Sequence, residues 1–145
     1  MLTTPLEGSA GTVLVVNEDQ AVLETVVAIL KDANFRVLSA PSVNAALKIT
    51  GETEDKIDLL LAHVDLPGMS GPDLGQELKK TRTDIHVMLI AGGKQGNLLV
   101  LNYGWAYINK ALVSAKLVQM VTEVLHSRDR SQLGGQEFDS RKDKP

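Results

Sequence analysis

The stretch DLLLAHVDLPGMSG, residues 58–71, places a histidine where an apolar run gives way to a loop rich in glycine. Residues 59–62 have the continuous apolar character of a strand that is buried on both faces. His63 therefore stands at the carboxyl end of a predicted strand. Its imidazole changes charge near neutral pH, can bind a metal and can accept a phosphoryl group on nitrogen.

Other side chains capable of chemistry follow the ends of other apolar runs. In parallel sheets, ligands collect beyond the carboxyl ends of the strands, so we expect these side chains to meet at one crevice. The strand-end residues that we examine beside His63, whether or not their side chains are reactive, are Asn17, Glu18, Asp19, Asp65, Ala91 and Lys110. A transition metal held by His63, Glu18 and Asp65, or a pH-sensitive pair of His63 with Glu18, is a possible use of this crevice.

Short apolar runs alternate with helical periodicity along the chain. Strands are predicted at residues 12–16, 35–39, 59–62, 85–91 and 107–109, and helices follow them, with Ser42, Ser70 and Ser114 as N-caps and residues 97–103 as the fourth helix. Helical crossovers between buried strands indicate a parallel sheet covered on both faces. The expected fold is α/β, a flavodoxin-like doubly wound sheet of five strands with five helices.

The composition indicates one domain, since 145 residues that are 43% hydrophobic can form a single core. We expect a flexible leader at residues 1–11, the folded domain at 12–128 and a disordered polar tail at 129–145. The net charge of -3 gives no reason to expect a nucleic acid partner. Without cysteine, a signal peptide or a membrane-length apolar run, the chain is expected to be cytoplasmic, with no membrane contact.

Four segments, VLVVNED, DLLLAHVDLPGMSG, VMLIAG and YINKAL, resemble in order and spacing the receiver domain of bacterial response regulators. The resemblance spans roughly residues 12–128. It implies an aspartate at the end of the third strand that accepts a phosphoryl group from a histidine kinase, and two acidic residues after the first strand that help to hold Mg²⁺. It also implies a Ser or Thr ending the fourth strand and a lysine on the fifth strand, followed by proline.

On this sequence the pattern departs from the family at its chemical positions. The acceptor position holds His63, and the positions of the acidic pocket hold Asn17, Glu18 and Asp65. The hydroxyl position holds Ala91, and the proline position holds Ala111. The switch aromatic is Tyr107, and the lysine is Lys110. Mg²⁺ requires oxygen ligands in octahedral geometry, so the replacements at positions 17 and 63 weaken the expected metal cage. We therefore expect no resident cofactor, with Mg²⁺ as a weakened alternative.

These departures predict a signalling domain of two-component or phosphorelay type that is not an enzyme and works through protein–protein contacts without phosphorylation. Its expected partner is a histidine kinase or another signalling protein. The alternatives are a working phosphoryl acceptor that uses His63 or Asp65, and a small-ligand or metal sensor in the same crevice. Tyr103 and the single tryptophan, Trp105, are candidates for an exposed interface, including that of a homodimer.

Overall fold

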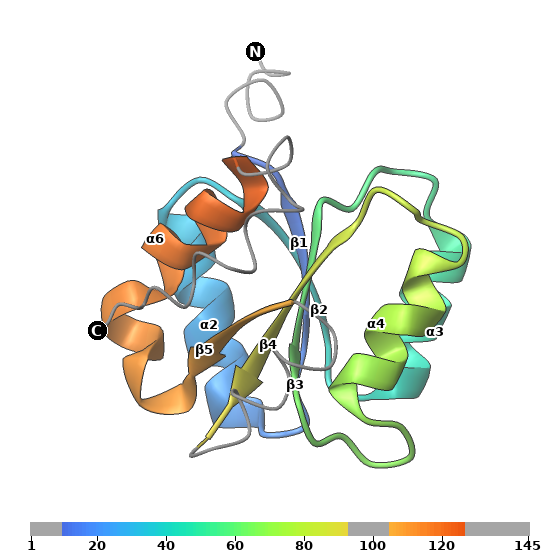
Figure 1. The fold of residues 1–145 in the computed structure, drawn as a ribbon, viewed down its shortest axis with the longest axis horizontal. Helices are drawn as coiled ribbons and strands as arrows, with labels where there is room; N and C mark the ends of the chain where they lie inside the picture. The colour runs from blue at the N-terminus through green and yellow to red at the C-terminus, as the bar shows by residue number, and fades with distance from the viewer. Residues whose placement is uncertain (1–9, 93–104, 127–145) are drawn as a thin grey trace.

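The computed structural model describes residues 10–92 and 105–126. Its five strands form one sheet in the order β2-β1-β3-β4-β5, and every neighbouring pair is parallel (Figure 1). The strands are β1 (Thr12–Val16), β2 (Arg36–Ala40), β3 (Leu59–His63), β4 (His86–Ala91) and β5 (Ala106–Asn109). The predicted fold class is confirmed, and each strand begins and ends within one residue of its expected position.

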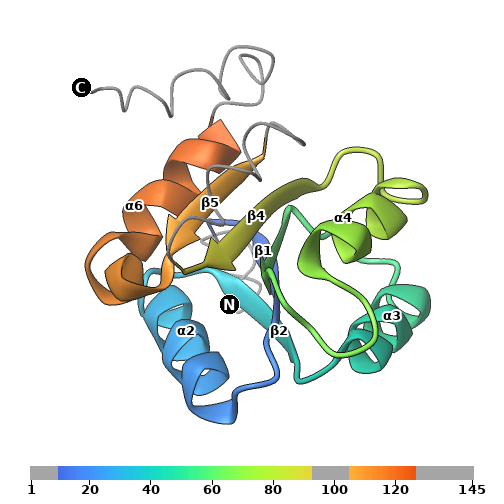
Figure 2. The ribbon, with the colours of Figure 1, turned by 60° about the horizontal axis from the view of Figure 1, so that its bottom comes forward.

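Helices cover both faces of this sheet. The described residues contain four α-helices, namely α2 (Gln20–Asp32), α3 (Val43–Glu52), α4 (Gly71–Lys79) and α6 (Val113–His126), and the 3₁₀ helix η1 (Lys110–Leu112). Helices α2 and α6 lie on one face, and α3 and α4 lie on the other (Figures 1 and 2). The predicted helix at 97–103, most of the predicted leader and the predicted tail lie outside the described residues.

Side-chain caps explain where the helices begin. Ser42 and Ser70 accept hydrogen bonds from backbone N–H groups in the first turns of α3 and α4, as predicted. The predicted cap at Ser114 is wrong. The Asn109 side chain accepts the N–H of Ala111 at 2.9 Å and begins η1, which continues into α6 and leaves Ser114 inside that helix.

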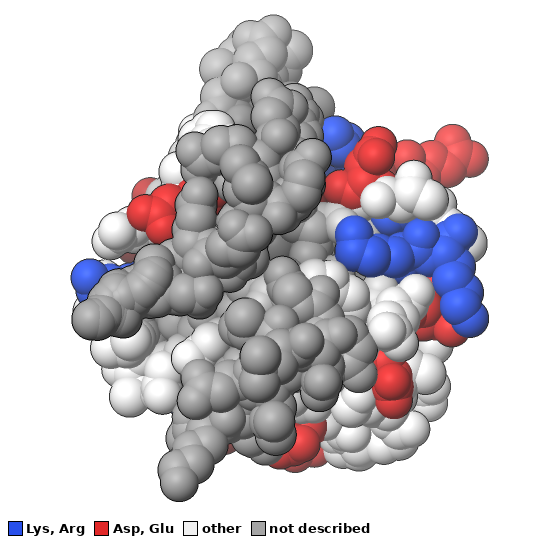
Figure 3. Space-filling model, viewed as in Figure 1, with Lys and Arg blue, Asp and Glu red and all other residues white. Residues whose placement is uncertain are grey.

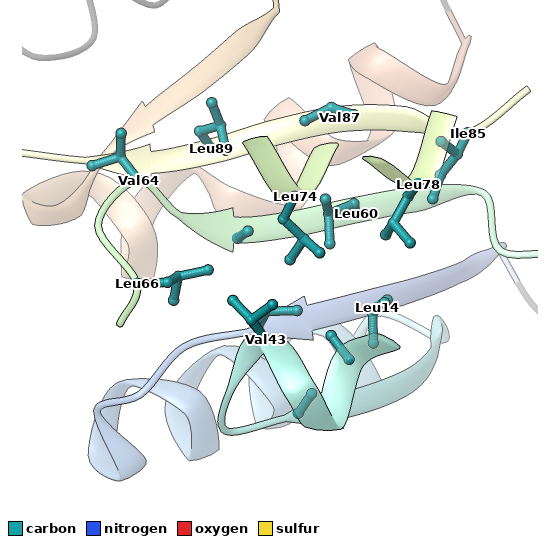
Figure 4. Close-up of a cluster of buried hydrophobic side chains, with 14 of the residues drawn as sticks. Leu14, Val43, Leu60, Val64, Leu66, Leu74, Leu78, Ile85, Val87 and Leu89 are labelled. Carbon is teal, nitrogen blue, oxygen red and sulfur yellow. The ribbon is translucent and has the colours of Figure 1, made fainter. Parts of the chain in front are cut away.

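Alternation along the strands divides the core into two layers. On the α3 and α4 side, Leu14 and Leu60 of the sheet pack with Leu74 and Leu78 of α4 (Figure 4). The opposite layer contains Val13, Leu59 and Leu61 from the same strands, packed with residues of α2 and α6. Because the central strands are buried on both faces, their carboxyl ends are held in fixed relative positions.

At the amino end of the sheet, Arg82 joins two connections that are distant in sequence. Its guanidinium donates to the carbonyl oxygens of Asp55 at 2.9 Å, Thr53 at 2.8 Å and Thr50 at 3.1 Å. Arg82 follows α4, whereas its three acceptors lie in or after α3. The arginine therefore ties together the chain segments that enter β3 and β4.

Two further side chains stabilise the amino end. Asp58 accepts the Thr12 N–H at 2.8 Å, and Lys79 donates through Nζ to the Ile85 carbonyl oxygen at 2.6 Å. Burial lowers the pKa of the Lys79 ammonium below its ordinary value, and the Asp84 carboxylate partly opposes this shift. Basic and acidic side chains lie beside each other over the α4 side of the molecule (Figure 3).

Candidate functional site

The carboxyl ends of the strands bring the predicted site residues to one edge of the sheet. In the parallel register Val16 pairs with Ala62, so Asn17 and His63 follow as neighbours on adjacent strands. His63 in turn pairs with Ile90, and Ala91 pairs with Asn109. The expected crevice residues are therefore ordered across four neighbouring strands, from Asn17 after β1 to Lys110 after β5.

Asn17 is almost fully buried, with 2% of its surface exposed. Its backbone N–H donates to the Ala40 carbonyl oxygen at 3.2 Å, and its Oδ1 accepts the Asp19 N–H at 2.9 Å. Its Nδ2 is also buried and has no hydrogen-bond partner in the described part of the chain. Asn17 thus presents a donor at a position where the resemblance implied a metal-binding carboxylate.

The two acidic residues after Asn17 have different roles. Asp19 caps α2, because its Oδ1 accepts the N–H groups of Ala21 at 3.0 Å and Val22 at 3.2 Å. Glu18 is exposed. One carboxylate is therefore engaged by a helix terminus, and the other is open to solvent.

His63 is half-buried and contacts the backbone two residues further on. Its Nδ1 lies 3.0 Å from the carbonyl oxygen of Asp65 and 3.1 Å from the Asp65 N–H nitrogen. A protonated Nδ1 donates to the oxygen, whereas an unprotonated Nδ1 accepts from the N–H, so the tautomer determines which bond forms. In both cases the ring is anchored to the loop, while the Asp65 residue itself is exposed.

The loop that follows β3 needs glycine at two positions. Gly68 has a φ of +86°, a backbone conformation that side chains with a Cβ rarely adopt. At Gly71 the chain passes so close to the His63 carbonyl oxygen that an added Cβ would overlap it. The loop is closed by the Gly71 N–H, which donates to the Val64 carbonyl oxygen at 2.9 Å. Sequence reasoning noted the LPGMSG loop but not this close approach, which depends on tertiary structure.

The remaining predicted positions lie on β4, β5 and η1. Ala91 is buried with 1% exposure, and Tyr107 is half-buried against the core layer that contains Leu14. Lys110 is exposed at the start of η1 and lines a groove of about 230 Å³ with Ala21 and Val22 of α2. Ala111 follows it in η1.

Trp105 packs against the core and is not fully exposed. It is half-buried, and its ring lies so close to Gly75 of α4 that a Cβ added there would be 3.0 Å from it. Tyr103, the other proposed interface residue, lies outside the described residues. A role of this pair in an interface remains a prediction.

Within 10–92 and 105–126, no three histidine or acidic side chains lie together so that they could hold a metal ion. No helix in those ranges is both long enough and apolar enough to cross a bilayer.

The fold agrees with comparisons to known proteins. The family model described as response regulator receiver domain matches residues 13–122. The sensor kinase CckA of Brucella abortus is 32% identical over 129 residues, which are 87% of this chain and 14% of that kinase. The chain thus corresponds to a small part of that relative.

Solved structures of receiver domains have the same fold. The receiver domain from the hybrid histidine kinase CckA has 27% identity and a TM-score of 0.62, with 79% of this chain and 99% of that domain covered. The CheY-like receiver domain protein from Methanospirillum hungatei has 24% identity and a TM-score of 0.71, over 83% of this chain and 97% of its own. From the match over residues 13–122, this chain belongs to the response regulator receiver domain family.

Proposed function

We propose that this receiver domain signals through protein–protein contacts and does not depend on phosphorylation of an aspartate. The observation that carries the proposal is the anchored histidine at the end of β3. The resemblance makes His63 the counterpart of the acceptor residue. Its Nδ1 lies 3.0 Å from the Asp65 carbonyl oxygen. In this proposal the imidazole anchors the loop. It stands where a carboxylate would otherwise accept a phosphoryl group.

The chemistry of the neighbouring side chains supports the same proposal. Phosphoryl transfer to a carboxylate uses a divalent cation to neutralise the charge of the phosphoryl oxygens, and Mg²⁺ takes oxygen ligands. Asn17 uses its amide oxygen for the Asp19 N–H and leaves Nδ2, a donor, without a partner among the described residues. Asn17 therefore suits a cation less well than an aspartate would.

The position that would respond to a phosphoryl group is also altered. Ala91 ends β4 with a buried methyl group, which cannot donate a hydrogen bond to an arriving oxygen. Tyr107 and Lys110 keep the residue types of a switch and a phosphoryl partner. We propose that they serve a fixed signalling surface, in a domain that is not an enzyme and needs no resident cofactor.

The partner that we propose is a histidine kinase or another signalling protein in the cytoplasm. The relative with 32% identity is a sensor kinase, and the similar solved domain belongs to a hybrid histidine kinase. A domain of this kind can influence such a kinase by binding to the surface of the kinase that an ordinary receiver domain would contact.

A second candidate function is a phosphoryl acceptor that uses His63. If Nδ1–H donates to the Asp65 carbonyl oxygen, Nε2 keeps its lone pair, and the ring is already oriented by the backbone. Nε2 could then attack a phosphoryl donor and form a nitrogen–phosphorus bond as the donor's leaving group departs. Asp65, which is exposed, is the other acceptor that we consider.

Intact mass spectrometry after incubation with Mg²⁺ and acetyl phosphate tests the proposal. The triple variant N17D/H63D/A91T, which restores the family's residue types, serves as the positive control. We expect this variant to gain one phosphoryl mass and the natural chain to gain none.

Variants and adduct chemistry separate the alternatives in the same experiment. An adduct on the natural chain that is lost in H63A but kept in D65A, and that is labile in acid, would overturn the proposal in favour of His63. Loss in D65A alone, with lability in base, would identify Asp65 as the acceptor.

A further inference from the structure

Helices α2 and α6 lie side by side on one face of the sheet, and a groove of about 230 Å³ lies between their first turns (Figures 1 and 2). Residues of α2, of η1 and of the start of α6 line this feature, which we call the α2–α6 groove. The lining residues are Ala21, Val22, Thr25, Val26, Lys110, Val113 and Ser114. His63 and Asn17 do not line it, so the groove is separate from the crevice at the strand ends.

The floor of the α2–α6 groove is apolar. Val26 and Val113 are buried in the core layer that contains Val13, and Val22 is half-buried against the same layer. Ala21 is exposed beside them, and its methyl group leaves the groove open. Removing apolar surface of this kind from water is favourable, so the floor suits an aliphatic occupant.

Three polar side chains surround this apolar floor. The Lys110 ammonium has no ion-pair or hydrogen-bond partner in the described part of the chain. The hydroxyl groups of Thr25 and Ser114 likewise have no hydrogen-bond partner within residues 10–92 and 105–126. An apolar groove with a few convergent polar groups is the usual form of a small-molecule site.

The charge at this groove favours an anionic head group. Lys110 is the only charged side chain among the lining residues. Neither η1, which it begins, nor α6 has an acidic residue in its first turn, so the positive end of the helix dipole acts in the same direction as the ammonium. The Asp19 carboxylate at the start of α2 is already bonded to the N–H groups of Ala21 and Val22.

We infer that the α2–α6 groove binds a small amphiphile, an aliphatic chain of about four to eight carbon atoms that ends in a carboxylate. The carboxylate pairs with the Lys110 ammonium and accepts the Ser114 hydroxyl, and the chain covers the apolar floor. The groove has the volume of about eight water molecules, which is close to the size of hexanoate. The inference goes beyond the proposed function and does not depend on how the domain signals.

A titration followed by the backbone amide resonances of Val22, Thr25 and Ser114 tests this inference. Sodium hexanoate is the probe, and sodium chloride at equal ionic strength is the control. Acetate has the same head group without the chain, and 1-hexanol has the chain without the charge. We expect saturable shifts with hexanoate. Binding should be roughly tenfold weaker for acetate, which loses the partly buried methylene groups, and roughly fivefold weaker for hexanol, which loses one charge interaction.

Matched variants assign the two parts of the ligand. K110Q should weaken hexanoate binding about fivefold and leave hexanol binding unchanged. Its control is K116Q, because Lys116 is an exposed lysine of α6 that does not line the groove. A21L places a larger side chain over the groove and should abolish the saturable shift at Ser114. Its control is A28L, because Ala28 is an exposed alanine of α2 outside the groove.

Four results would each overturn the inference. They are shifts with hexanoate that do not saturate, hexanol binding as tight as that of hexanoate, equal hexanoate binding by K110Q and K116Q, and equal hexanoate binding by A21L and A28L. Because the titration uses neither a phosphoryl donor nor a partner protein, its outcome is separate from that of the phosphorylation experiment.

Discussion

The two ends of the sheet are held together in different ways. At the amino end, side-chain hydrogen bonds join segments that are far apart in sequence. Arg82 lies 27 to 32 residues from its three acceptors, and Asp58 lies 46 residues from Thr12. The side-chain hydrogen bonds described above at the carboxyl end reach only two or three residues, as at Asn17, Asp19 and His63. The difference suggests that the amino end maintains the fold, whereas residues at the carboxyl end can change with little loss of stability.

Replacement of Gly71 by alanine should be an exception to the tolerance of the carboxyl end, with the largest expected loss of stability. The carboxyl end tolerates new side chains only where there is room, and a Cβ at Gly71 would overlap the His63 carbonyl oxygen. We expect G71A to lower the free energy of unfolding by about 2–4 kcal/mol, measured by urea denaturation. The control is G51A in α3, where nothing lies within 4 Å of an added Cβ. That variant should gain roughly 0.5–1 kcal/mol from helix propensity.

The second prediction concerns the arginine at the amino end. R82M removes three hydrogen bonds from a charged donor to backbone carbonyls, and we expect a loss of about 2 kcal/mol in the same measurement. K80M, which removes an exposed ion pair with Glu77, should cost about 0.5 kcal/mol or less. Equal losses in the two variants would show that the long-range bonds of Arg82 do not stabilise the amino end.

A smaller effect is expected at the carboxyl end for His63. H63A removes a half-buried ring with a local hydrogen bond, and the free energy of unfolding should fall by about 1 kcal/mol or less. Denaturant titration of H63A beside R82M compares the two ends directly. A loss in H63A as large as that in R82M would contradict the distinction between them.

The smallest effect should be seen in the pH dependence at Lys79. Because burial lowers its pKa in the folded state, the folded protein releases this proton at lower pH than the unfolded chain does. The natural chain should therefore gain stability relative to K79M as the pH rises through the alkaline range below 10.5, the ordinary pKa of lysine. Urea unfolding of both chains from neutral to alkaline pH measures this difference. If the difference in free energy of unfolding between the two chains stays constant with pH, the pKa of Lys79 is not lowered in the folded state.

Local patterns in the sequence predicted much of this fold. Apolar runs located all five strands, because β1, β3 and β4 are almost continuously apolar and β2 and β5 each have an apolar centre. Serine followed by helical periodicity located the caps at Ser42 and Ser70. The same rule failed at Ser114, because Asn109 already caps the 3₁₀ helix η1 that precedes α6. The sequence does not show which of these two polar residues will be the cap.

The site was only partly predictable from sequence for a similar physical reason. The strand ends placed Asn17, His63 and Lys110 at one edge of the sheet, because parallel strands share their direction. The anchoring of His63 to Asp65, the buried amide of Asn17 and the close approach at Gly71 depend on tertiary geometry. The bonds of Arg82 have no local sequence signal, because their acceptors are backbone carbonyls.

The contact between Trp105 and Gly75 gives the protein a built-in optical reporter. Trp105 is the only tryptophan in the chain, so its emission comes from a single place, where the strand that carries Tyr107 meets α4. The indole is partly shielded from water where it packs beside Gly75 and against the core layer that contains Val87, and its emission will shift if α4 moves away from β5. Partner binding or a conformational change on this side of the sheet can therefore be followed by intrinsic fluorescence, without an added label.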